Sequence, residues 1–261
     1  MQRNTSLAAL AATALLAFGS AASAQTGISV NFGTNEAGSA LAPTAAAGVV
    51  PLTNFNNETG GTGSGLSLVD STGASSTATV TFAANNGTFH TGQNPADGPN
   101  QTLLAGYLDT ASGNSSQPTT TVGFANIQYA TYSVYVYTAT NTSGYHDTRT
   151  NSYTISGATT GNATQTNVQP NGGEFANGFV AGQNYLLFSG LSGSSFLLSA
   201  TALSSANAPG DAGFIRAGID GIQIVRAMPA AAPEPSQTAA LGLGVLGLGA
   251  LILRARRRAS A

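Results

Sequence analysis

The sequence predicts an all-β domain, a two-layer antiparallel β-sandwich, placed between an N-terminal and a C-terminal apolar segment. Short runs rich in β-branched and aromatic residues recur along the chain, and turn-forming pairs such as Asn171-Gly172 and Pro209-Gly210 separate them. No amphipathic helical stretch of about a dozen residues lies outside the two ends. A parallel β-solenoid is the alternative architecture, and the lack of a repeat of fixed length argues against it.

About ten short segments are expected to be strands, a number that suits two stacked antiparallel sheets. In chain order they are Gly27–Gly33, Leu66–Asp70, Ala78–Ala83, Leu103–Asp109, Thr120–Phe124, Tyr132–Ala139, Ser152–Ser156, Asn184–Ser189, Ser195–Ala200 and Arg216–Arg226. In Tyr132–Ala139 both alternating faces are apolar or aromatic, which predicts a central strand covered on both sides. In Arg216–Arg226 the inward-facing positions shift by one residue, which predicts a β-bulge near Asp220-Gly221.

Residues 1–24 have the three parts of a secretory signal peptide. Arg3 supplies the positive charge, residues 7–18 form the apolar stretch, and Ala22-Ser23-Ala24 is a small-residue cleavage site. We therefore expect Ala22 and Ala24 to direct cleavage and the exported chain to begin at Gln25. A buried N-terminal helix is the alternative, and it is disfavoured because the twelve-residue apolar run ends in small residues at an Ala-x-Ala site.

Residues 233–261 also have three parts, which follow a linker at 227–232 and the sandwich domain at 25–226. Pro233-Glu234-Pro235 comes first, the apolar span 238–253 second, and a cluster of arginines last: Arg254, Arg256, Arg257 and Arg258. A helix over Ala239–Leu253 would be ~22 Å long at ~1.5 Å per residue, somewhat less than a ~30 Å hydrocarbon core. With Thr238 included and the bilayer locally thinned, it is expected to form a transmembrane helix whose arginines stay in the cytoplasm.

This tripartite tail resembles the PEP-CTERM sorting signal of Gram-negative bacteria that make exopolysaccharide. The resemblance covers about a tenth of the chain and depends on the order of the Pro-Glu-Pro motif, the apolar span and the arginine cluster. It implies that Pro233, Glu234 and Pro235 are recognised by an exosortase, a membrane transpeptidase. The chain would then be held transiently in the inner membrane and afterwards reach the cell surface or the extracellular space. A plain membrane anchor is the alternative.

The composition excludes several classes of function. The chain contains no Cys, which rules out disulfides, thiolate metal sites and cysteine nucleophiles. Only 7% of its residues are charged, against roughly a quarter in an average soluble chain. Between the two ends, nine carboxylates stand against three arginines, so this region is acidic and is not expected to bind nucleic acid.

We identify no catalytic residue and no metal site from the sequence. The two histidines, His90 and His146, lie in turn-rich stretches without a nucleophile-elbow motif, and the polar group His146, Asp147 and Arg149 is expected in a surface loop. Glycoside hydrolysis would need a pair of carboxylates, for which the candidates are Asp70, Asp109, Glu174 and Asp220. No cofactor is expected; a structural Ca²⁺ would suit a secreted β-domain, but no calcium-loop spacing is found.

Carbohydrate binding would need exposed aromatic rings, and the loop aromatics Phe55, Tyr107 and Tyr145 are the candidates. The closing run Arg216–Val225 resembles the final strand of galactose-binding-like jelly rolls, which implies a jelly-roll-like sandwich. The segment around Asn54-Phe55-Asn56-Asn57 resembles one in exported bacterial proteins with this kind of tail, which often carry Trp before Asn-Asn. This chain has Phe55 instead, which weakens a sugar-stacking role there. The sequence thus favours a non-enzymatic surface or matrix protein. The alternatives are a carbohydrate-binding module that acts on exopolysaccharide and, third, a glycan-active enzyme.

Overall fold

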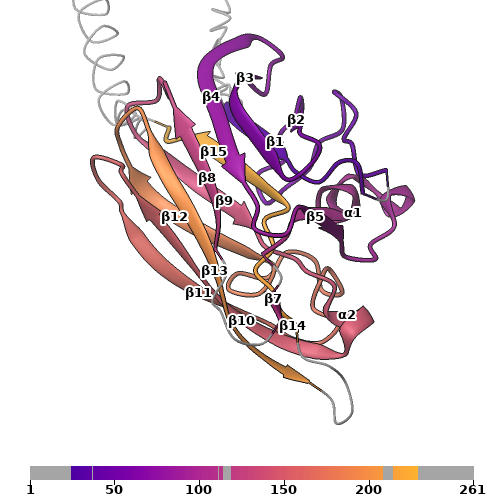
Figure 1. Cartoon of the computed structure of the whole chain (residues 1–261). Helices are drawn as coiled ribbons and strands as arrows, with labels where there is room; N and C mark the ends of the chain where they lie inside the picture. The colour runs from indigo at the N-terminus through magenta and orange to yellow at the C-terminus, as the bar shows by residue number, and fades with distance from the viewer. Residues whose placement is uncertain (1–24, 37, 111, 114–118, 208–213, 229–261) are drawn as a thin grey trace, which may run out of the picture.

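The computed structural model describes residues 25–36, 38–110, 112–113, 119–207 and 214–228. They form a mostly β structure in which two sheets, antiparallel except for one short pair, lie one over the other (Figure 1). The antiparallel pairings confirm the all-β prediction and exclude a parallel solenoid. Within the described residues no helix is long and apolar enough to cross a bilayer. The expected signal peptide at 1–24 and the expected span at 238–253 lie outside these residues.

The first sheet has five strands, and its central strand is β15. The strands, in spatial order, are β12 (Tyr185–Leu191), β9 (Tyr132–Tyr137), β15 (Gly221–Arg226), β1 (Gly27–Asn31) and β2 (Asn56–Asn57). All neighbours are antiparallel except β1 and the two-residue β2. Because Gly27 of β1 pairs with Val225 of β15, the first and last described residues emerge side by side.

The second sheet has six strands and is fully antiparallel. In spatial order they are β11 (Ala163–Gln169), β10 (Asp147–Ser156), β13 (Phe196–Asn207), β8 (Thr119–Ala125), β4 (Ser75–Ala83) and β3 (Thr62–Val69). Two small pairs complete the structure: β5 (Thr88–His90) with β6 (Gly106–Leu108), and β7 (Ser112–Gly113) with β14 (Phe214–Ile215). The described helical turns are short: η1 (Pro95–Asp97), α1 (Pro99–Leu103) and α2 (Thr142–Tyr145).

The main core fills the space between the two sheets. Alternate residues of each strand point into it, as the period of two in a β-strand requires. Phe32, directly after β1, meets Phe82 of β4 edge to face, with ring centroids 5.1 Å apart. Both rings are almost completely buried, so this pair joins the two layers.

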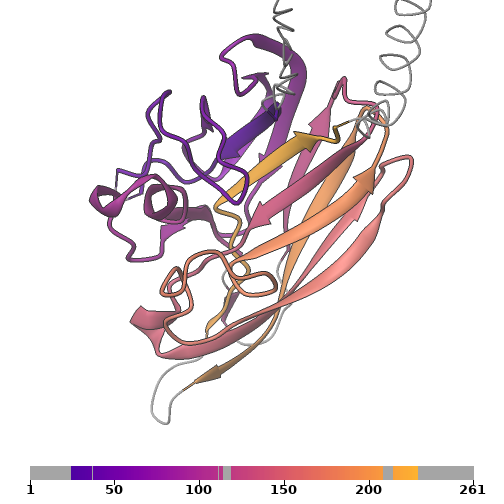
Figure 2. The same ribbon diagram turned by 180° about the vertical axis from the view of Figure 1, so that it is seen from behind.

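A second apolar cluster covers the outer face of the five-stranded sheet. The segment between β1 and β3, together with α1, contributes Leu41, Leu52, Phe55 and Leu103, which lie in one cluster with Tyr137 of β9. The cover is visible in Figure 2, where the N-terminal segments lie over this sheet. Strand β9 is therefore covered on both sides, as its two apolar faces predict.

Several predicted boundaries are wrong. Leu103 ends helix α1, so the strand predicted over Leu103–Asp109 is shortened to Gly106–Leu108. The last strand begins only at Gly221. Its pairing with β1 and β9 starts there without a register shift, so the predicted β-bulge near Asp220-Gly221 is wrong. Gly221 serves close packing, because an added Cβ would lie 2.7 Å from the Val30 carbonyl oxygen. Strand β11 was not predicted, because its sequence, ATQTNVQ, is mostly polar.

Candidate functional site

A polar cluster lies between the two sheets at the end of the sandwich that carries α2. The cluster is formed mainly by the inward-facing side chains of β10. Along this strand they are first polar (Asp147, Arg149 and Asn151) and then apolar or aromatic (Tyr153 and Ile155). All five side chains are buried. Burial of a charge is costly unless a partner compensates it, so the contacts of these residues decide what the cluster does.

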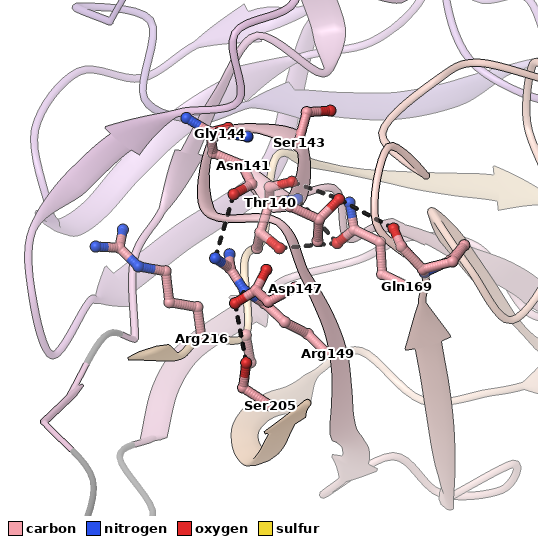
Figure 3. Close-up of polar contacts among 12 residues, drawn as sticks. Thr140, Asn141, Ser143, Gly144, Asp147, Arg149, Gln169, Ser205 and Arg216 are labelled. Carbon is pink, nitrogen blue, oxygen red and sulfur yellow. Dashed lines mark hydrogen bonds and ion pairs between the residues drawn. The ribbon is translucent and has the colours of Figure 1, made fainter. Parts of the chain in front are cut away.

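Arg149 and Asp147 form the first ion pair of the cluster. The Arg149 Nε donates to the Asp147 carboxylate at 2.9 Å, and both side chains are completely shielded from solvent. The same carboxylate oxygen accepts a hydrogen bond from the Ser205 hydroxyl, and Arg149 donates to the Asn141 carbonyl at 3.2 Å (Figure 3). The prediction that Asp147 and Arg149 lie in a surface loop is wrong: their alternation, two residues apart, places both on the inward face of β10.

Arg216 and Asp109 form the second ion pair. The Arg216 guanidinium donates to Asp109 at 2.8 Å and to the Tyr107 hydroxyl at 3.2 Å. Its Cζ lies 4.6 Å from the ring centroid of Phe89 and 5.2 Å from that of Tyr145, so two aromatic rings flank the cation. The Tyr145 ring also lies 5.4 Å from the Cζ of Arg149 and thereby joins the two ion pairs.

The neighbouring titratable groups are held in their neutral forms. Burial, and next to it the charge of Asp109, raises the pKa of Tyr107 far above that of an ordinary tyrosine. Burial also raises the pKa of Asp220 well above the usual aspartate range. The backbone N–H groups of Ala139 and of Asp220 itself favour the charged form of this carboxylate, although neither makes a hydrogen bond of normal geometry to it. The loss of solvation on burial outweighs their effect on the pKa.

Amide and hydroxyl side chains extend the cluster toward the five-stranded sheet. Gln169 of β11 accepts from the Thr140 backbone N–H and hydroxyl and donates to the Thr140 carbonyl (Figure 3). Asn167, two residues earlier, donates to the Thr138 hydroxyl at 3.0 Å. These bonds join β11 to the segment after β9, and so close one side of the sandwich.

The contacts of the cluster are those of a structural network. Glu174, another candidate acid, accepts from the backbone N–H and the hydroxyl of Ser143 and so fixes helix α2. In the described part of the chain, neither His90 nor His146 forms a side-chain hydrogen bond with a serine or a carboxylate, and His90 instead stacks on Phe89. No group of three His, Asp or Glu side chains close enough to hold a metal ion occurs among the residues the structure describes.

The structure brings the predicted residues Tyr107, Asp109 and Tyr145 together around Arg216, but it does not bring the candidate acids together as an accessible pair. Asp109, Glu174 and Asp220 are buried, whereas Asp70 is half-buried and accepts hydrogen bonds from Thr72 and Ala74 within its own turn. Of the three candidate sugar-stacking rings, Phe55 and Tyr107 are buried and present no ring face to solvent, while Tyr145 is half-buried over the two arginines. The sorting residues 233–235 and 254–258 and the cleavage residues Ala22 and Ala24 lie outside the described residues.

The outer face of the six-stranded sheet is a second feature, and it was not singled out from the sequence. Its strands alternate buried residues with small polar ones, so that threonine and serine side chains point outward. We call this surface the hydroxyl face; its residues are Thr79, Thr81, Thr119, Thr121, Ser152, Thr154, Thr164, Thr166, Ser199 and Thr201. The Thr-x-Thr pattern in several strands is the signal that could have revealed it.

Comparisons with protein-family models, with curated proteins and with solved structures give no match.

Proposed function

We propose that this chain is a non-enzymatic cell-surface or extracellular-matrix protein of a Gram-negative bacterium that makes exopolysaccharide. It is exported by residues 1–24, held transiently in the inner membrane by the span 238–253, and sorted by an exosortase that recognises Pro233, Glu234 and Pro235. The observation that carries the proposal is the ordered tail itself, with the motif, the apolar span and the four terminal arginines in sequence.

The arrangement of the domain supports this role. Gly27 and Val225 are paired neighbours, so the exported N-terminus and the start of the tail leave the sandwich at one place. Helix α2, followed directly by β10 with its buried Asp147–Arg149 pair, lies at the other end of the sandwich (Figures 1 and 2). A chain tethered through its tail would therefore present the α2 end to the exterior.

A structural role is also supported by the state of the acids. A glycosidase needs an accessible acid and an accessible carboxylate on either side of its substrate. Asp109 and Asp147 are buried and bound to arginines, Glu174 is bound to Ser143, and Asp220 is buried in the core. We therefore propose no catalytic residue and place a glycan-active enzyme last among the alternatives.

A carbohydrate-binding module is the second candidate, favoured by the uncharged hydroxyl face and by the jelly-roll likeness of the closing run. Hydroxyl surfaces are insensitive to ionic strength, because salt screens charges and leaves neutral hydrogen bonds in place. This suits an exterior of variable salt.

The sorting proposal is tested by replacing Pro233, Glu234 and Pro235 with alanine in a host that carries an exosortase. We expect wild-type protein in the surface or medium fraction and the variant in the inner-membrane fraction, because the transpeptidase would no longer recognise the tail. Cell fractionation followed by immunoblotting measures the distribution, and the same host without the transpeptidase is the control. Wild-type protein in the cytosol would contradict the proposal.

A further inference from the structure

We propose that the hydroxyl face binds an extended, uncharged polysaccharide chain that lies across the strands of the six-stranded sheet. This inference deepens the proposed function, because it names the surface and the chemical class of the partner. It rests on three features of the face: its hydroxyls are in register, its outward-facing strand residues carry no charge, and its rows follow the twist of the sheet.

The register places the hydroxyls in rows across four strands. Ser199 of β13 lies opposite Thr154 on one side and Thr121 on the other, and Thr154 in turn lies opposite Thr164. A second row, two residues along each strand, contains Thr166, Ser152, Thr201 and Thr119. Neighbouring strands are about 4.7–4.9 Å apart. The spacing between successive hydroxyls in a row is therefore close to the length of one sugar unit.

These hydroxyls retain hydrogen-bonding capacity. A serine or threonine hydroxyl has one donor and two acceptor positions. Thr154 and Thr164 share one hydrogen bond at 2.9 Å, and Thr119 and Thr201 share one at 3.2 Å, which leaves further positions on each oxygen. The side chains of Thr121, Ser152, Thr166 and Ser199 make no hydrogen bond with another described protein group.

The charge of the surface decides between neutral and acidic polymers. Among the described strands of this sheet, no outward-facing residue is charged or aromatic. The surrounding domain carries more carboxylates than arginines, so it would repel an acidic polysaccharide and would not repel a neutral one. The exposed side chain of Leu197 lies over Gly123 on the same face and adds an apolar contact for the C–H groups of a sugar ring.

The shape of the face favours a flexible polymer. The two hollows described, of about 390 and 210 Å³, are lined by residues between 38 and 102 and between 170 and 184, and not by the outward-facing residues of this sheet. Neighbouring strands in a sheet are rotated by about 20–25°, so the rows of hydroxyls fan out across the sheet. A polymer with freely turning linkages can follow this twist, whereas a flat crystalline surface would meet only part of it.

The test is affinity electrophoresis of the purified full-length protein in gels that contain dextran, mannan, laminarin or alginate. We expect retardation by at least one of the three neutral polymers and none by alginate. The variant T121V/T154V/T164V removes three hydroxyls from one row and keeps the branched side-chain shape, and it should weaken binding at least about tenfold. The serine variant T121S/T154S/T164S keeps the hydroxyls and should bind within about twofold of wild type.

The matched control is T44V/T59V/T159V, which changes three exposed threonines outside the face and should bind as wild type does. No retardation by any neutral polymer, equal binding by the valine variant, or binding of alginate alone would overturn the inference. Sedimentation that shows self-association lost in the valine variant would also overturn it, because the face would then join copies of the chain. The assay does not depend on export, so correct sorting without glycan binding would refute this inference alone.

Discussion

Arg149→Ala is expected to lower the free energy of unfolding by about 3–5 kcal/mol. The substitution leaves the completely buried Asp147 without its cation, and among the described residues only the Ser205 hydroxyl still donates to the carboxylate. It also removes the hydrogen bond to the Asn141 carbonyl, which holds the segment before α2 against β10. Urea unfolding of the purified protein measures the loss.

Two further variants separate the ion pair from general effects of substitution. D147N/R149M removes both charges together and is expected to be less destabilised than the single alanine variant, because no unpaired charge stays buried. Arg226→Ala removes an exposed arginine at the end of β15 and should change the stability by less than about 0.5 kcal/mol. A loss below about 1 kcal/mol for Arg149→Ala would show that the buried pair is not needed for the fold.

Asp220→Asn is expected to make the protein more stable at pH 8 by about 1–3 kcal/mol and to leave it nearly unchanged near pH 4. Burial raises the pKa of the folded-state carboxyl well above the usual aspartate range. The unfolded chain therefore loses its proton first as the pH rises above about 4, and the wild-type protein loses stability from there up to the folded-state pKa. Asparagine cannot ionise and removes this dependence.

The measurement is the free energy of unfolding between pH 4 and pH 8. Asp97→Asn is the control, since Asp97 is exposed and its replacement should keep the wild-type dependence on pH. If Asp220→Asn keeps the wild-type slope, the carboxyl is not held neutral in the folded protein.

The alternation of residues predicted the positions of the central strands correctly. In Tyr132–Tyr137 both faces are apolar, and the structure covers both, one by the main core and the other by the cluster around Leu41 and Phe55. The predictions were less successful where a strand is polar. Strand β11 carries Gln and Asn on its inward face and Thr on its outward face, so hydrophobic periodicity gives no signal.

The two buried ion pairs, Asp147–Arg149 and Asp109–Arg216, show why a site of this kind is not predictable from one sequence. Charged residues in a sequence usually indicate a surface position. Arg149 and Asp147 are buried instead, because each neutralises the charge of the other. Arg216 and Asp109 meet from segments 107 residues apart, and local patterns contain no information about such a pairing. The sequence places Phe55 and Tyr107 among loop aromatics, but Phe55 is buried in the cover over the five-stranded sheet and Tyr107 is buried beside Arg216.

The most direct test of the proposed export and sorting is the intact mass of the protein recovered from outside an exosortase-bearing host. We predict a chain that begins at Gln25 and ends close to the Pro233-Glu234-Pro235 motif, without the apolar span and the arginines. A recovered chain that still begins at Met1, or that still ends at Ala261, would contradict it.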